Sequence, residues 1–202
     1  MQSLSLRSFV LIFVLAVAII GCEKDKDEKE NSFSYDSNSY DTPKGYIDKY
    51  GANQDGQSAD FDVILCSSSI SYNSTEEEYT GLGNAVYIDL NSSSLTELVS
   101  GTYTYDETRN QNTFVDAGIY IDYDLATDTG TEYWTDDNTT GTVTINKSGS
   151  TYEITYSITL ETGEKVEGYY KGTLETAYVS AHATKNSTKV DKHTVKTFKG
   201  KR

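Results

Sequence analysis

The strongest constraint on the fold is a strict two-residue alternation over residues 151–161. Every second position is apolar and the positions between are polar; the apolar set is Tyr152, Ile154, Tyr156, Ile158 and Leu160. A helix would spread these side chains around its circumference, whereas successive side chains of a strand point to opposite faces. The run therefore predicts a β-strand with one buried face.

Shorter alternating runs flank this strand and are joined to it by turns that contain glycine. Val143 and Ile145 precede it, and the turn at 147–150 connects them to it. A second turn at 161–164 leads into an alternating run over 166–174. Turns of two to five residues with glycine typically join antiparallel strands. Residues 141–175 are thus predicted to form a three-stranded meander.

Similar runs begin near Phe61, Val86 and Val115, so the strand pattern extends over residues 32–178. About six to nine strands without a long amphipathic helix predict an all-β domain. We expect an antiparallel β-barrel or β-sandwich with meander connections, and the pattern does not separate these two architectures. Two cysteines in 202 residues exclude a disulfide framework.

The first 21 residues have the features of a signal peptide. Arg7 precedes twelve apolar residues at 9–20, which as a helix would be about 18 Å long, too short for a ~30 Å hydrocarbon core. The run ends in Gly21 and Cys22, and this junction resembles the lipobox of bacterial lipoproteins. The resemblance implies cleavage before Cys22 and acylation of that residue, which would anchor the protein to a membrane. A buried cysteine after an ordinary cleavage site is the alternative.

Residues 22–31 form a charged linker, and every residue from 23 to 30 is charged. Such a run serves as a solvated spacer. Lys26, Asp27 and Glu28 also resemble the lysine-plus-acidic export signal of Bacteroidetes surface lipoproteins. We therefore expect a lipid-anchored protein of the outer membrane, at the cell surface or on the periplasmic face.

Four segments of the body resemble uncharacterised Bacteroidetes cell-envelope lipoproteins in sequence, order and spacing. They are GLGNAVYIDL at 81–90, GTYTY at 101–105, GTVTI at 141–145 and GYYKGTL at 168–174. The resemblance implies a compact lipocalin- or calycin-like β domain behind a lipid anchor. Its motifs are strand and turn patterns, so it transfers no activity and no site residue beyond Cys22.

Charge is divided unevenly along the chain. Residues 57–178 hold 21 acidic residues against four basic ones, a net of −17, whereas residues 182–202 hold seven basic residues against Asp191, a net of +6. An acidic body opposes nucleic-acid binding, which depends on clustered lysine and arginine. The basic tail, 179–202, is predicted to be partly disordered or an edge strand, and pairing with the acidic body is a third alternative.

The sequence offers little catalytic chemistry. Both histidines lie in the basic tail, so a histidine-assisted nucleophile in the body is not expected. Cys66 stands in an alternating strand and is interpreted as a small buried hydrophobe. Asp122, Asp124 and Asp128 only superficially resemble a calcium loop, because their spacing departs from the helix–loop–helix pattern. We expect no enzymatic activity, no cofactor and no metal site.

One segment suggests recognition. Tyr133 and Trp134, expected in a loop, are followed by Asp136 and Asp137. Aromatic faces beside hydrogen-bonding groups suit sugar rings, so the two rings could form a platform and the two aspartates could orient hydroxyls. The alternative is that Trp134 caps an open end of the core. The predicted function is binding of a glycan or small ligand; the alternative is a structural lipoprotein whose acidic surface docks an envelope partner protein.

Overall fold

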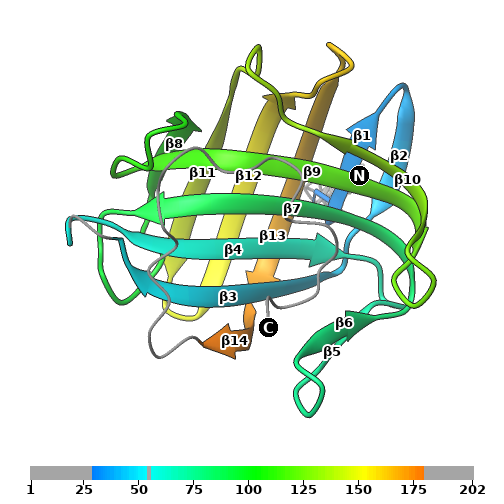
Figure 1. Cartoon of the computed structure of the whole chain (residues 1–202), viewed down its shortest axis with the longest axis horizontal. Coiled ribbons are helices and arrows are strands. Elements are labelled where there is room, and N and C mark those ends of the chain that lie inside the picture. The colour runs from blue at the N-terminus through cyan, green and yellow to red at the C-terminus, as the bar shows by residue number, and fades with distance from the viewer. Residues whose placement is uncertain (1–28, 54–55, 180–202) are drawn as a thin grey trace, which may run out of the picture.

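The computed structural model describes residues 29–53 and 56–179 (Figure 1). The expected signal peptide, the anchor Cys22, the export signal at Lys26, Asp27 and Glu28, and the tail after Val179 lie outside the described residues. The described part of the chain contains no helix, and so no helix with the length and hydropathy of a membrane span.

The expectation of an all-β domain is confirmed. Seven strands make up the first half: β1 (Ser32–Tyr35), β2 (Asn38–Asp41), β3 (Lys44–Ala52), β4 (Ala59–Cys66), β5 (Ser71–Asn73), β6 (Glu78–Thr80) and β7 (Leu82–Ser92). Seven more follow: β8 (Gly101–Tyr105), β9 (Thr113–Asp124), β10 (Thr129–Trp134), β11 (Gly141–Ser148), β12 (Thr151–Thr159), β13 (Lys165–Thr173) and β14 (Glu175–Val179).

Twelve of these strands form one sheet, and β5 and β6 form a separate hairpin. The sheet order is β14-β3-β4-β7-β9-β8-β11-β12-β13-β1-β2, and β10 pairs with β9 away from this path. The strand number exceeds the six to nine expected, because short strands such as β5, β6 and β10 form in segments where no alternating run was predicted. The sheet is also mixed rather than purely antiparallel, since β14 runs parallel to β3 and β8 runs parallel to β9.

The predicted meander over 141–175 is present as β11, β12 and β13, paired antiparallel in sequence order. The sheet curls into a half-barrel: β3, β4, β7 and β9 lie side by side in a front layer, and β11, β12 and β13 cross behind them at a steep angle (Figure 1). The two layers come together where β13 packs back against β3.

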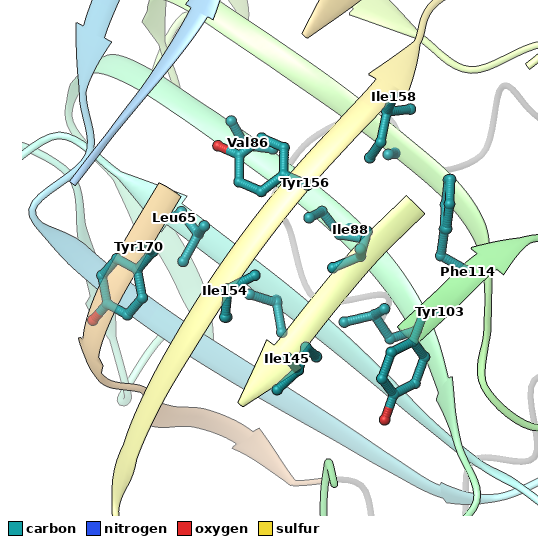
Figure 2. Packing of buried hydrophobic residues seen from close by; sticks show 14 of the residues in the cluster. Leu65, Val86, Ile88, Tyr103, Phe114, Ile145, Ile154, Tyr156, Ile158 and Tyr170 are labelled. Atoms are coloured by element: carbon teal, nitrogen blue, oxygen red, sulfur yellow. The ribbon is translucent and has the colours of Figure 1, made fainter. Parts of the chain in front are cut away.

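The space between the layers is filled by one cluster of apolar side chains. Figure 2 shows Ile154, Tyr156 and Ile158 of β12 facing side chains of the front layer, among them Leu65, Val86 and Ile88. Packing is tight enough that a Cβ at Gly168 would stand 2.2 Å from the Tyr156 hydroxyl oxygen. The interior is therefore a packed core built from the residues that alternation places on the inner faces.

The central front strands differ from the expectation of one buried face. All eight residues of β4 are buried, as are the last eight of β7 and the first eight of β9. A second cluster on their outer face explains part of this burial; it includes Tyr46, Ile64, Tyr87 and Tyr120 together with Tyr79 of the β5–β6 hairpin. The outer face of β3, β4, β7 and β9 is thus a second buried surface.

Candidate functional site: a buried row of aspartates

Four aspartates stand in one line across the outer face. Asp48 of β3 pairs with Asp62 of β4, Asp62 pairs with Asp89 of β7, and Asp89 pairs with Asp116 of β9. Adjacent strands lie about 4.8 Å apart, so the line crosses four strands in roughly 14 Å. We call these four residues the aspartate row. A fifth, Asp60, lies two residues before Asp62 and on the same face.

The row is buried, with Asp62 only 4% and Asp89 only 2% exposed. Like charges placed directly opposite one another destabilise a sheet, and a buried carboxylate needs protons, cations or hydrogen-bond donors to offset the lost hydration. Four such residues in register are costly for folding alone. The stability of the row therefore depends on the groups that surround it.

Neighbouring segments supply donors to both ends of the row. At one end, the Tyr79 hydroxyl and the Tyr178 backbone N–H donate to Asp48 Oδ1 at 3.0 and 3.1 Å. At the other end, the Thr135 hydroxyl donates to Asp116 Oδ1. The row is thus held by the β5–β6 hairpin, by β14 and by the residue that follows β10.

Arg109 supplies a positive charge beside the row. Its Nη2 contacts Asp89 Oδ2 at 2.9 Å, and its Nη1 contacts Asp60 Oδ2 at 3.0 Å. Burial lowers the pKa of Arg109, but the carboxylates of Asp89 and Asp60 outweigh it, so the pKa stands above its ordinary value. The guanidinium is therefore a permanent cation within the site.

The loop between β8 and β9 is built to place this guanidinium. Arg109 has a φ of +57°, a left-handed conformation that costs a non-glycine residue on the order of 1 kcal/mol. Asp106 fixes the loop, because Oδ1 accepts from the Thr108 N–H at 2.7 Å and Oδ2 accepts from the Asn110 amide at 3.1 Å. The Ser58 hydroxyl donates to the Arg109 carbonyl oxygen at 3.2 Å and ties the loop to the start of β4.

Tyrosines line the row, and their hydroxyls remain neutral. Burial, followed by the negative charges of Asp62 and its neighbours, raises the pKa of Tyr50 and of Tyr87 far above the ordinary value. Tyr87 is 5% exposed, and its hydroxyl has no hydrogen-bond partner within residues 29–53 and 56–179. Tyr87 lies on the same face as Asp89, two residues before it in β7. It can accept a hydrogen bond from a group bound there.

One part of the cluster has the composition of a metal site. Single carboxylate oxygens of Asp60, Asp62 and Asp89 lie within 4.8 Å of one another. However, the Arg109 guanidinium contacts two of these three residues. A bound metal ion would have to share those oxygens with a fixed positive charge, so this donor set favours nitrogen cations over metal.

The predicted recognition residues are not brought together as one platform. Trp134 is the last residue of β10 rather than part of a loop, because β10 extends pairing with β9 up to the Trp134–Gly118 pair. Consecutive strand residues face opposite sides: Tyr133 packs on the inner core beside Tyr35, while the indole lies on the outer face. The two rings are therefore separated by the sheet.

The indole of Trp134 joins the aromatic cluster beside the row. Its centroid lies 5.8 Å from that of Tyr87 and 5.6 Å from that of Tyr120. It lies flat over Gly118, where an added Cβ would come within 2.7 Å of the ring. Trp134 remains partly exposed, so it forms a margin of the same outer face.

The two predicted aspartates lie in the turn after β10. Asp136 is half-buried and accepts hydrogen bonds from the Asn138 backbone N–H at 3.0 Å and from its side-chain amide at 3.2 Å. Asp137 is exposed. Asp136 thus stabilises its own turn, and a role for either residue in orienting hydroxyls stays a prediction.

Cys66 is fully buried, as expected for a small hydrophobe, and burial raises the pKa of its thiol to about 12. In the segment that superficially resembles a calcium loop, Asp124 accepts from the Ala126 N–H at 2.9 Å and Asp128 accepts from the Tyr123 hydroxyl at 2.7 Å. These carboxylates shape the β9–β10 turn.

Sequence reasoning missed the aspartate row. Three of its members stand between residues that alternation places in the core, for example Phe61 and Val63 around Asp62, or Ile88 and Leu90 around Asp89. That pattern is also typical of a solvent-facing position. The recurring signal of an aspartate between two apolar residues was present in three strands, but only the register between strands shows that the four residues meet.

Comparisons with protein-family models, with curated proteins and with solved structures gave no match to this chain.

Proposed function

We propose that this chain is a lipid-anchored binding domain of the cell envelope, and that it docks a basic segment of a partner protein on the outer face of β3, β4, β7 and β9. The aspartate row is the observation that carries the proposal. Carboxylates in register, with neutral tyrosine hydroxyls among them, suit lysine and arginine side chains, which form charge-assisted hydrogen bonds. The packed interior supports surface binding over carriage of a ligand inside the sheet.

The test uses a fluorescent hexalysine peptide as the probe and fluorescence anisotropy as the readout. Asp62→Asn with Asp89→Asn removes two charges from the middle of the row, and we expect it to weaken binding about ten-fold or more. Asp41→Asn with Glu164→Gln removes two charges from exposed positions and serves as the matched control. Equal binding by both variants would refute the proposal.

The membrane anchor is proposed on the resemblance of the junction at Cys22 to a lipobox. Metabolic labelling with a palmitate analogue should mark the wild-type chain and fail to mark Cys22→Ala, which should also leave the membrane fraction. Protease treatment of intact cells then separates the two faces, because a chain exported through Lys26, Asp27 and Glu28 would be cut, whereas a periplasmic chain would be protected.

A second candidate is glycan binding at the outer-face margin, and the partly exposed indole of Trp134 favours it. Stacking of a sugar ring on that edge would involve Trp134 without Tyr133, which faces the core. A glycan array compares the wild-type chain with Trp134→Ala. A signal that the substitution removes would support this candidate, and a blank or unchanged array would eliminate it.

A further inference from the structure

A chain of three aromatic rings leads from the single tryptophan to the turn between β9 and β10. The ring centroids of Trp134 and Tyr120 lie 5.6 Å apart, and those of Tyr120 and Tyr123 lie 4.9 Å apart. All three rings belong to the cluster on the outer face, and they come from the β9–β10 hairpin (Figure 1). Such centroid separations are those of rings in direct contact. An electron can therefore pass along the three rings from one end to the other.

A backbone irregularity puts Tyr123 beside Tyr120. In a regular strand, residues three positions apart face opposite sides of the sheet. Asp122 has a φ of +48°, and the β9–β10 pairing shifts register between Thr129 and Thr131. β9 therefore bulges at this point, and the bulge turns Tyr123 to the face that Tyr120 occupies. A positive φ strains a residue that is not glycine, and this strain is what adds the second tyrosine to the chain of rings.

Tyr123 has a proton acceptor at the solvent end of the chain of rings. Its hydroxyl donates to Asp128 Oδ1 at 2.7 Å, and Asp128 is exposed in the β9–β10 turn. Burial, followed by this hydrogen bond, raises the pKa of Tyr123, so the phenol is neutral and has to release its proton when it loses an electron. The carboxylate of Asp128 can accept that proton directly and pass it to solvent.

The other tyrosine in contact with the indole lacks this arrangement. The ring centroid of Tyr87 lies 5.8 Å from that of Trp134, but its hydroxyl has no hydrogen-bond partner within residues 29–53 and 56–179. Loss of an electron from Tyr87 would leave its proton without an acceptor in hydrogen-bond contact. Oxidation is therefore directed along the branch that ends at Tyr123.

We infer that one-electron oxidation of this protein enters at Trp134 and ends at Tyr123. The partly exposed indole of Trp134 gives one electron to a one-electron oxidant, which is reduced, and its Nε1 proton goes to water. One electron then passes from Tyr123 through the ring of Tyr120 to the indolyl radical, which regains a proton from water. The phenolic proton of Tyr123 moves to Asp128. The products are a neutral tyrosyl radical beside the turn and an intact tryptophan, so the transfer keeps the oxidising equivalent away from the inner core.

Pulse radiolysis of the full chain in azide solution tests the transfer. The azide radical oxidises tryptophan in preference to tyrosine, and this chain has one tryptophan. We expect the absorption of the tryptophanyl radical to decay while that of a tyrosyl radical appears, at a rate that does not depend on protein concentration. Tyr123→Phe keeps the ring and removes the hydroxyl, and it should slow this decay about ten-fold or more.

Two further variants test the proton acceptor. Asp128→Asn replaces the carboxylate with an amide that does not take up the proton, and it should slow the transfer about ten-fold. Tyr169→Phe is the matched control, because the Tyr169 hydroxyl also donates to a carboxylate, that of Glu153 at 3.1 Å, but lies on β13 in the rear layer. This control should leave the rate unchanged.

A measurement on the wild-type chain needs no substitution. Nitrogen dioxide couples to a tyrosyl radical at the ring carbon next to the C–O bond, and the hydrogen of that carbon moves to the oxygen to give 3-nitrotyrosine. After treatment with nitrogen dioxide, tandem mass spectrometry should find more 3-nitrotyrosine at the buried Tyr123 than at the more exposed Tyr169. Nitration governed by solvent access alone would give the opposite order and would overturn the inference.

The kinetic experiment has its own contrary outcomes. A tryptophanyl radical that decays without forming a tyrosyl radical would overturn the inference, as would a rate that rises with protein concentration. A rate unchanged by Tyr123→Phe would place the end point at another tyrosine. Equal rates for Asp128→Asn and Tyr169→Phe would remove the role assigned to Asp128 and, with it, the reason for transfer to Tyr123.

Discussion

Arg109 offers the sharpest test of the electrostatics of the outer face. It is 6% exposed, and its guanidinium contacts Asp89 at 2.9 Å and Asp60 at 3.0 Å. Removing one member of a buried ion pair leaves the other charge uncompensated and typically costs 3–5 kcal/mol. We expect Arg109→Met to lower the free energy of unfolding by about that amount, a large part of the roughly 5–15 kcal/mol that stabilises a domain.

Urea unfolding measures the loss, followed by far-ultraviolet circular dichroism and by fluorescence of Trp134, the single tryptophan. With a slope of about 2 kcal/mol per molar urea, the midpoint should fall by roughly 2 M. Lys147→Met, which removes an exposed ion pair with Glu97, is the matched control and should leave the midpoint nearly unchanged.

A rescue experiment separates charge from packing. Adding Asp60→Asn and Asp89→Asn to Arg109→Met removes the uncompensated charges and should restore at least half of the lost stability. A loss below about 1 kcal/mol for Arg109→Met, or a triple variant no more stable than the single one, would refute the view that Arg109 neutralises the buried aspartates.

Three other chemical features and the tail give further predictions. Gly168→Ala should destabilise by about 1–3 kcal/mol in urea unfolding through collision with the Tyr156 ring and hydroxyl, and Tyr156→Phe should restore little of this, because the ring carbon Cζ would still stand 2.3 Å from the added Cβ. Because the folded-state pKa of Tyr87 is raised, its contribution to the free energy of unfolding is complete below about pH 10 and is lost as the unfolded chain ionises above it. The part of the absorbance at 295 nm that belongs to Tyr87, taken as the difference from Tyr87→Phe, should rise only with unfolding. Cys66, whose thiol pKa is raised to about 12, should react with Ellman's reagent only in urea, and labelling of its peptide in the native protein would contradict this. If the basic tail pairs with the acidic body, endoproteinase Lys-C should cleave 180–202 faster in about 0.5 M than in about 0.05 M salt, and an unchanged rate would count against this alternative.

Local alternation was enough to predict the rear layer. The inward set on β12, including Ile154, Tyr156 and Ile158, was assigned correctly, because each strand of the meander has one buried face. The front layer was harder. β4 is buried on both faces. The local sequence pattern does not indicate that Asp62, on the outer face of β4, is covered by other groups.

The site could not be predicted for a related reason. Asp48, Asp62, Asp89 and Asp116 are separated by up to 68 positions in sequence, and they meet only through the register of three strand pairs. Register depends on turns and bulges, such as the shift in the β7–β9 pairing after Asp89. Alternation specifies which face a side chain occupies and leaves its cross-strand neighbours undetermined.

The two end strands of the curled sheet affect whether neighbouring molecules can pair edge to edge. Its two terminal strands are short: β2 has four residues and ends in the exposed Asp41, and β14 has five. Short, charged outer strands are poor templates for strand addition by a neighbouring molecule. A population confined to a membrane plane, where encounters are frequent, would thereby resist edge-to-edge polymerisation.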